Sequence, residues 1–205
     1  MDKTFKIQKK YNRNAIVYDL IEFPVEKVLY SKWRKKYFSN LIGKVLDVGI
    51  GTGKNIDYYN NEAEVTGIDF SKKMLEKAKR KLKKSGRKNI SLKLMDIENL
   101  KFRDNSFDYV ITSSVFCSVP NPIEGLKEIK RVLKPNGKLI MVEHVLSKNK
   151  IIAFFENLFN PLVKFLTGVN INRNTRQNIE KSGMVVKKEK NLALIDIFRL
   201  FVAEK

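Results

Sequence analysis

The chain has 205 residues, with 41 Lys and Arg against 22 Asp and Glu, which gives a formal net charge of +19. This length suits one domain, and a hydrophobic content of 43% excludes a chain that is disordered throughout. A single Cys and a single His exclude an intramolecular disulfide and a structural zinc site of the usual kind, and we expect no metal.

The positive charge is spread along the sequence, and its densest run is Lys72–Lys88. Such a charge is typical of nucleic-acid or anionic-membrane binding, but also of a solvated Lys-rich surface, which we take as the first interpretation. The first ten residues hold four Lys and no apolar stretch, so they do not resemble a secretory signal. No apolar run approaches the roughly 20 residues of a spanning helix. We therefore expect a cytoplasmic protein that could also contact a membrane surface.

The first forty residues combine charged and aromatic side chains at helical spacing. We expect residues 1–40 to form a helical cap over the functional site, with Tyr11 and Tyr18 facing that site. Ordinary aromatic packing is the alternative for both side chains.

From Lys44 to Leu146, short apolar runs alternate with helical patterns. The helical patterns follow Ser71, a suitable N-cap, and start again at Pro122. Because strands that alternate with helices form βαβ units, the sequence predicts an α/β fold with a parallel sheet. Asn136-Gly137 predicts a turn directly before the fifth strand. The predicted strands are Val45–Val48, Val65–Ile68, the alternating segment Ile90–Met95, Phe107–Thr112 and Leu139–Val142.

Two later segments fall outside that alternation. Residues 151–169 are apolar and aromatic and are interrupted by Pro161. We expect them to form a lid whose apolar face packs on the sheet, and the alternative is a membrane-surface element helped by the positive charge. Residues 175–205 predict a helix at Thr175–Lys181 and β-strands at Val185–Glu189 and Ile195–Val202. The whole chain, 1–205, is thus expected to form one domain around a core at 44–146.

The strongest motif is the glycine-rich segment after the first predicted strand. Gly49, Gly51 and Gly53 allow a tight turn and let a ligand lie against the backbone. Asp69 closes the next predicted strand, where a carboxylate can accept both hydroxyls of a ribose. Asp47 stands two residues before the first glycine; its charge would repel a pyrophosphate but suits an ammonium group. This charge favours S-adenosylmethionine over NAD as the ligand.

At these residues the chain resembles the class I S-adenosylmethionine-dependent methyltransferases, and the resemblance covers nearly everything from Lys44 to Leu146. Asp47–Gly53 is similar to their first motif, and Thr66–Asp69 to the segment that bears their ribose-binding acid. Met95–Ile97 resembles their adenine-binding segment, Ser106–Asp108 the start of their fourth strand, and Leu133–Gly137 the turn before their fifth.

The resemblance implies a Rossmann-like, seven-stranded, mostly parallel sheet with helices on both faces and one antiparallel strand from the last hairpin. It implies that Asp47 and the glycines hold the methionine end of S-adenosylmethionine, that Asp69 holds the ribose, and that Asp96 and Ile97 hold the adenine. The cofactor-binding residues predicted in this way are Asp47, Gly49, Gly51, Gly53, Asp69, Phe70, Met74, Asp96, Ile97 and Ser113.

A narrower resemblance points to the acceptor. The segments YNRNAIVYDLIE, FCSVPNP, VEHV and GVNINRNT are similar to bacterial phosphatidylethanolamine N-methyltransferases and to methyltransferase-like thiol S-methyltransferases. The chain resembles quinone-biosynthesis C-methyltransferases more distantly. The resemblance implies methyl transfer to a small or lipophilic acceptor, such as an amine phospholipid, a thiol or a quinone-like ring.

Three residues are candidates for a catalytic or acceptor-orienting role. His144 follows the fifth predicted strand, where a titrating group could act as a base, unless it is a structural histidine. Arg173 could orient an acidic or phosphate-bearing acceptor, unless it lies in a surface turn. Tyr18 belongs to the expected cap. Cys117 lacks the Pro-Cys context of RNA cytosine methyltransferases, so we expect it to pack in the core.

Other functions stay open at this stage. RNA methylation is favoured by the charge, but the segment Ser113–Phe116 replaces the Asn/Asp-Pro-Pro-aromatic motif, so we do not expect a nucleic-acid partner. A protein that binds S-adenosylmethionine without catalysis is a further alternative, and an NAD oxidoreductase is the most distant one.

Overall fold

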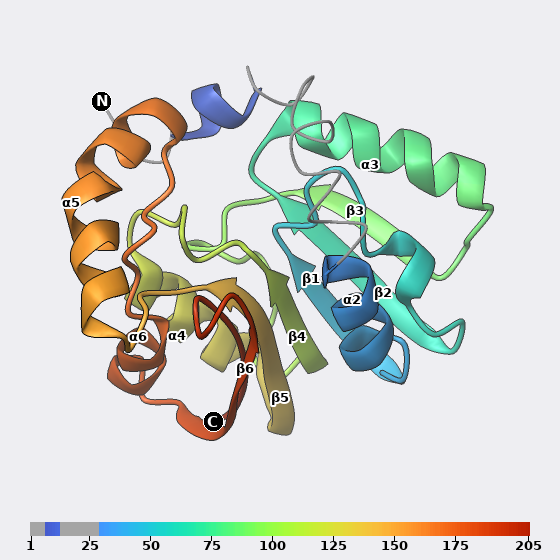
Figure 1. Ribbon diagram of the computed structural model, residues 1–205. Helices are drawn as coiled ribbons and strands as arrows, with labels where there is room; N and C mark the ends of the chain where they lie inside the picture. Colours follow the sequence, from blue (N-terminus) through green and yellow to red (C-terminus); the bar gives the residue numbers. More distant parts are fainter. Residues whose placement is uncertain (1–6, 13–28) are drawn as a thin grey trace.

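The computed structural model describes residues 7–12 and 29–205 (Figure 1). Part of the expected cap, including Tyr18, lies outside the described residues. Among the described residues, no helix combines the length and the apolar character needed to cross a bilayer.

A single seven-stranded sheet forms the centre of the molecule, in the order β3-β2-β1-β4-β5-β7-β6. Neighbouring strands pair in parallel from β3 to β5, whereas β7 is antiparallel to both of its neighbours. This arrangement confirms the predicted Rossmann-like sheet with one reversed strand. The strands are β1 (Gly43–Val48), β2 (Ala63–Asp69), β3 (Ile90–Leu94), β4 (Phe107–Ser113), β5 (Leu133–His144), β6 (Val185–Ala193) and β7 (Phe198–Glu204).

Helices cover both faces of this sheet, as expected. Successive side chains of a strand point to opposite faces, so Leu46 of β1 joins one apolar core and Val45 joins the other. The first core is closed by α4 (Pro122–Val132) and α6 (Thr175–Lys181), and the second by α2 (Ser31–Phe38), the short 3-10 helix η2 (Ile56–Tyr58) and α3 (Lys72–Ser85).

Local signals in the sequence explain where α3 begins and ends. The Ser71 hydroxyl accepts a hydrogen bond from the Met74 amide at 3.2 Å, which confirms the predicted N-cap. Gly86 ends the helix with a φ of +68°. Met74, Leu75 and Ala78 are buried, and much of the Lys72–Lys88 charge faces solvent. The exposed lysines of the helix are Lys72, Lys73, Lys79, Lys83 and Lys84.

Several strand boundaries differ from the sequence-based expectation, and β6 extends to Ala193 where Glu189 was the expected end. Strand β5 begins at Leu133, not Leu139, but its pairing jumps from Leu133 to Lys138, so the expected Asn136-Gly137 turn forms a bulge in the strand. Strand β7 begins only at Phe198, because Leu194 and Ile195 have φ values of +50° and +62°, which no strand accommodates.

The segment expected to be a lid forms one helix, α5 (Lys150–Thr167), which continues through Pro161. Figure 1 shows α5 at the side of the molecule, with the described N-terminal segment 7–12 near its C-terminal end. The expectation that its apolar face packs on the sheet is wrong, because eight large hydrophobic side chains of α5 are exposed. Glu156 is instead the one residue of the helix that is buried.

Candidate functional site

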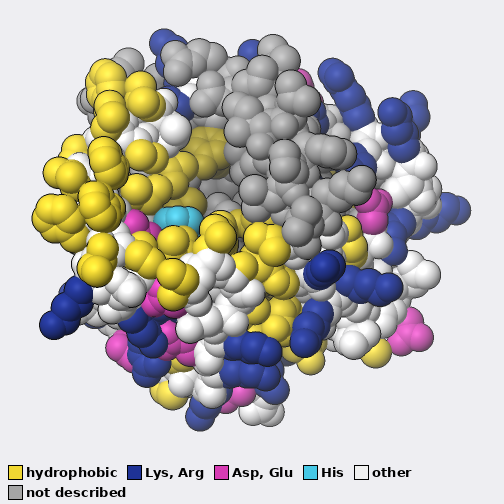
Figure 2. Space-filling view, viewed as in Figure 1, with side chains coloured by type: hydrophobic (Ala, Val, Ile, Leu, Met, Phe, Trp, Pro, Cys, Tyr) yellow, Lys and Arg dark blue, Asp and Glu magenta, His cyan; other side chains and the backbone are white. Residues whose placement is uncertain are grey.

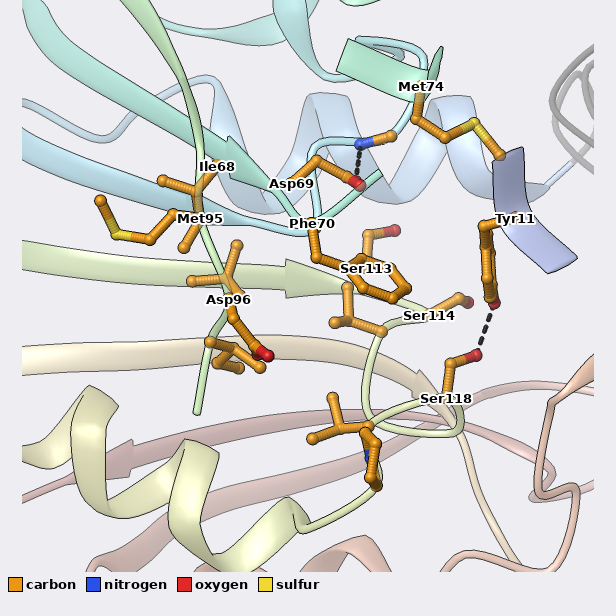
Figure 3. Close-up of a pocket in the computed structure, with 17 residues that line it drawn as sticks. Tyr11, Ile68, Asp69, Phe70, Met74, Met95, Asp96, Ser113, Ser114 and Ser118 are labelled. Atoms are coloured by element: carbon orange, nitrogen blue, oxygen red, sulfur yellow. Dashed lines mark hydrogen bonds between the residues drawn. The ribbon is translucent and has the colours of Figure 1, made fainter. Parts of the chain in front are cut away.

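A pocket of about 710 Å³, its open mouth included, lies at the carboxyl ends of β1, β2 and β4 (Figure 3). This is the edge where open parallel sheets bind their ligands. Eight of the ten residues predicted to bind the cofactor line this pocket: Gly49, Gly51, Asp69, Phe70, Met74, Asp96, Ile97 and Ser113.

The three glycines of the motif have different structural roles. All have positive φ values, +69° at Gly49, +58° at Gly51 and +85° at Gly53. A Cβ at Gly49 would lie 2.5 Å from the Val115 side chain, and one at Gly53 would press on Ala78 of α3. At Gly51 the nearest atom would be 3.9 Å away, so this residue leaves open space on the pocket side. Gly53 does not line the pocket and instead allows close packing of α3.

Asp69 ends β2 with its carboxylate held by two backbone amides. One oxygen accepts from Gly51 at 2.9 Å and the other from Ser71 at 2.7 Å. Burial raises the pKa of Asp69 to about 6, against the lowering effect of these two amides. Because each carboxylate oxygen has two lone pairs, each still has one acceptor site for a ligand.

Apolar side chains and a second carboxylate make up the rest of the pocket wall. Phe70 and Met74 come from the start of α3, and the Tyr11 ring meets Phe70 edge-on at 5.7 Å. Figure 3 shows Tyr11 opposite Ser118, and their hydroxyls form a hydrogen bond. Asp96 follows β3 and accepts from the Glu98 amide at 3.0 Å. An aromatic base could therefore lie between apolar surfaces with a carboxylate beside it.

A smaller, more polar pocket adjoins the first, and the two share Gly49, Gly51, Ser113 and Ser114. Its wall includes Arg34 of α2 and Asn55. The Arg34 guanidinium donates to the Asn55 side chain, whose amide donates to Asp47 at 2.8 Å. Together the two pockets form one elongated site, apolar at one end and polar at the other.

Asp47 lies behind this second pocket and lines neither cavity. It is fully buried and accepts from Asn55 and from the Tyr59 hydroxyl, while its Oδ1 atom has no hydrogen-bond partner among the described residues. Burial raises the pKa of Asp47 to about 6. A buried carboxylate with an unused oxygen is what a cationic ligand group would stabilise.

Glu143 fixes the loop after β4. Its buried carboxylate accepts from the Thr112 hydroxyl at 2.6 Å and from the Val115 and Phe116 amides at 2.9 and 3.1 Å. Burial raises the pKa of Glu143 to about 7. Arg173 also holds this loop, since it donates to the Phe116 and Val119 carbonyls at 3.0 and 2.8 Å. Arg173 does not line the pocket.

His144 ends β5 and also lies outside the two pocket walls. Its ring meets the Phe198 ring edge-on at 5.4 Å, and its Nδ1 atom is buried without a hydrogen-bond partner among the described residues. Burial lowers the pKa of the imidazole, which keeps it neutral near pH 7. Cys117 is buried, and burial raises the pKa of its thiol to about 12, in keeping with the expected packing role.

Several residues of the site were not predicted. Ser114 and Ser118 lie in the loop that Glu143 fixes, and Arg34 and Asn55 come from segments without a motif. Arg34 is only 6% exposed in a helix otherwise rich in exposed Lys. Its identity as arginine among lysines in the segment SKWRKK is the one signal in the sequence that could have indicated a buried role.

Comparison with known proteins shows relatives across most of the chain. A family model described as a methyltransferase domain matches residues 46–141. A phosphatidylethanolamine N-methyltransferase of Cereibacter sphaeroides is 34% identical over 161 residues, which cover 74% of this chain and 77% of that protein. A demethylmenaquinone methyltransferase of Staphylococcus epidermidis is 34% identical over 168 residues, which cover 78% of this chain but only 65% of the relative.

Solved structures with the same fold are more distant in sequence. The chain matches the complex of a Haloferax volcanii methyltransferase activator and a methyltransferase with a TM-score of 0.72, at 19% identity and with 95% and 96% of the two chains covered. It matches a Leishmania major S-adenosylmethionine-dependent methyltransferase with a TM-score of 0.74, at 16% identity and with 99% and 82% covered. These similarities concern the fold.

Proposed function

Because the chain belongs to the class I S-adenosylmethionine-dependent methyltransferases, we propose that it methylates a small, lipophilic acceptor: an amine phospholipid, a thiol or a quinone-like ring. The activity and the cofactor follow from the family. The acceptor class rests on the apolar pocket wall, and the relatives named for phosphatidylethanolamine and demethylmenaquinone, both lipids, agree with it.

The nucleoside end of the cofactor fits the larger pocket. Each Asp69 oxygen has an acceptor site left for a ribose hydroxyl, and Gly51 leaves room for the ligand against the backbone. Phe70 and Met74 offer apolar surfaces for the adenine, and Asp96 offers an acceptor for its amino group. These features support the roles that we assign to the four residues.

The methionine end fits the smaller pocket. Arg34 offers a guanidinium for the carboxylate, a pairing that arginine makes with two parallel hydrogen bonds. Asp47 supplies negative charge toward the ammonium group through Asn55, and a cation nearby would lower the raised pKa of this acid. The cofactor would thus lie along the whole elongated site.

The chemistry asks mainly for alignment and exclusion of water. S-adenosylmethionine supplies a methyl group on a sulfonium, which is a good leaving group. Holding the acceptor in line with that methyl can lower the barrier by roughly 7–11 kcal/mol. Ser113 and Ser114 border both pockets, and Tyr11 closes one side of the larger one, so these residues would position the acceptor and keep water away.

The proposal rests on a single observation, the apolar wall at the end of the larger pocket where we place the acceptor. Val115, Val119 and Pro120 form its wall together with Tyr11 and Ser118. Among the described residues that line this larger pocket, Asp69 and Asp96 are the only ones with a full charge, and none is basic. A lipophilic acceptor suits such a wall, whereas the phosphates of RNA would need cations there.

His144 remains the proposed general base, with Tyr18 and Arg173 as proposed contributors. The lowered pKa of His144 leaves its imidazole neutral and able to accept a proton. Arg173 donates two hydrogen bonds to backbone carbonyls of the loop that bears Ser118. Arg173 would therefore act indirectly, by positioning this loop. We also propose peripheral contact with an anionic membrane, where lipophilic acceptors are found.

The deciding experiment is a turnover assay with isotopically labelled S-adenosylmethionine. Phospholipids, alkyl and aryl thiols, quinols and RNA are supplied in separate pools, and mass spectrometry identifies the methylated product. We expect product in one lipophilic pool. Label only in RNA would overturn the proposed acceptor class, and cofactor binding without turnover in any pool would favour the alternative of a non-catalytic binding protein.

A further inference from the structure

Helix α5 exposes the side that a helix of a water-soluble protein normally buries. Exposed fractions of its eight large apolar side chains run from 49% to 77%. They follow helical spacing and cover about 140° of the helix circumference at 100° per residue. The inward side holds the buried Glu156, so the usual arrangement is reversed. The eight residues are Ile151, Phe154, Phe155, Leu158, Phe159, Leu162, Phe165 and Leu166.

A second apolar feature belongs to the same region. Leu194 and Ile195 form the tip between β6 and β7 and are 60% and 71% exposed. Both have positive φ values, a conformation that is strained for a β-branched residue such as Ile195. A glycine at position 195 would relieve this strain and expose less apolar surface. The stability of the fold therefore does not explain why an isoleucine stands at this tip.

Buried hydrogen bonds tie the tip to α5. The Asp196 carboxylate, next to the tip, accepts from the Ser147 hydroxyl and from the Lys148 amide. The Ser147 amide in turn donates to Glu156 of α5 at 2.8 Å. Arg199 braces Asp196 with a further bond at 2.6 Å. The inward-facing acids therefore fix the tip and the helix as one unit, with the apolar side chains of both exposed.

Basic side chains lie near both ends of α5. Lys150 and Lys164 are exposed on α5, and Lys10 lies at the C-terminal end of the helix, where its ammonium donates to the Lys164 and Phe165 carbonyls. Glu156 is the only acid in α5, and it is buried. Figure 2 shows hydrophobic side chains gathered over the α5 side of the molecule, while many of the basic side chains lie elsewhere on this face. Attraction by a net charge of +19 would still act at a distance on an anionic surface.

We infer that α5 and the 194–195 tip form a docking surface for an anionic lipid bilayer, with α5 lying in the membrane plane. An apolar face with lysines beside it is the pattern of an interfacial helix. The helix does not meet the requirements for crossing the bilayer. This inference deepens the proposed function, since a membrane-held acceptor would be presented at the side of the molecule where segment 7–12 joins α5 to the pocket.

The test is cosedimentation of the full chain with vesicles at low salt, using equal parts of phosphatidylglycerol and phosphatidylcholine, or phosphatidylcholine alone. The wild type should bind the anionic vesicles more strongly. Phe154→Ser combined with Leu158→Ser should weaken this binding about tenfold or more. Ile195→Gly should weaken it less, and it should not impair folding because glycine accepts the positive φ.

A matched control is available elsewhere on the surface. Ile42 and Leu94 are each 54% exposed and lie outside the docking surface, so Ile42→Ser combined with Leu94→Ser should bind vesicles as the wild type does. Equal binding by the α5 variant and this control would overturn the inference, as would a wild type that stays in solution with both vesicles. A dimer in sedimentation velocity that the α5 variant breaks would assign the surface to a second copy instead.

The two proposals can fail separately. Vesicle binding is measured without methyl transfer, and cofactor binding by each variant is measured by calorimetry. Vesicle binding that depends on α5, together with no turnover on any lipophilic acceptor, would remove the proposed function and leave the docking surface. Turnover on a water-dispersed lipophilic acceptor without vesicle binding would support the proposed function and remove the docking surface.

Discussion

Two regions of this molecule reverse the usual distribution of side chains. At the carboxyl edge of the sheet, Asp47, Asp69 and Glu143 are buried, and on α5 eight large apolar side chains are exposed. The buried acids are all hydrogen-bonded within the domain. The exposed aromatic side chains of α5 pack mainly on one another, and Phe165 also lies below the Lys10 ammonium. The first reversal costs folding energy inside the protein, and the second creates a surface that water solvates poorly.

The two proposed functions would require two different departures. The proposed cofactor site needs hydrogen-bond acceptors that are already in place, and its buried carboxylates have raised pKa values. The proposed docking surface instead needs apolar side chains that the domain itself leaves uncovered. Each region can be tested by changes that should affect it and leave the other intact.

Among substitutions in the site, the largest effect on stability is expected at Glu143. Glu143→Ala would leave the Thr112 hydroxyl and the Val115 and Phe116 amides buried without their acceptor. We expect the free energy of unfolding to fall by about 3 kcal/mol, because unpaired buried donors keep their full desolvation cost. Urea unfolding measures this. Glu124→Ala, at an exposed ion pair of α4, should cost less than about 1 kcal/mol and serves as the control. Equal losses would contradict an anchoring role for Glu143.

The glycine loop allows a matched pair of substitutions. Gly49→Ala places a Cβ 2.5 Å from Val115 and should cost about 2 kcal/mol of stability. Gly51→Ala meets no atom closer than 3.9 Å and should cost only the strain of its positive φ, about 1 kcal/mol. Calorimetry should nevertheless show weaker cofactor binding by the Gly51 variant, since the added methyl group occupies ligand space. Unchanged affinity there would contradict the proposed position of the cofactor.

Asp69→Ala should act on binding more than on folding. The substitution leaves the Gly51 and Ser71 amides without their acceptor. Burial raises the pKa of Asp69, so removal of its poorly solvated charge offsets part of that loss. Affinity for S-adenosylmethionine should fall by about 1–3 kcal/mol, the cost of leaving ribose hydroxyls unpaired. Isothermal titration calorimetry measures this, and an unchanged dissociation constant would refute the role of Asp69.

The raised pKa values predict opposite pH dependences for folding and for binding. Asp47 and Asp69 have pKa values of about 6, above those of unfolded aspartates, so the folded state holds protons more tightly. Their contribution to stability is therefore greatest at low pH and falls as pH rises from about 4 to 6. Cofactor affinity should rise over pH 5 to 7.5, by about tenfold for each carboxylate that must ionise. An affinity that does not change with pH would show that binding needs neither charge.

How far the sequence predicts this molecule depends on the range of the interactions. The strand pattern, the Ser71 cap and the glycine loop are local signals, and the sheet and most of the pocket follow from them. Arg34 was not predicted because its place beside Asn55 depends on how α2 packs. For α5, periodicity indicates an apolar face but not which way it points. The hydrogen bond from the Ser147 amide to Glu156 turns the Glu156 side of the helix inward, and no sequence motif predicts this hydrogen bond.

The smallest expected effect is the one on α5 in the absence of lipid. Phe154→Ser combined with Leu158→Ser removes apolar side chains that are 61% and 57% exposed. Urea unfolding should show a change within about 0.5 kcal/mol, as for other surface substitutions, whereas Ile179→Ala in the core should cost about 2–5 kcal/mol. A large loss at α5 would mean that its aromatic face supports the fold in solution. A small loss, combined with weaker vesicle binding, would mean that these side chains are retained for a partner outside the domain.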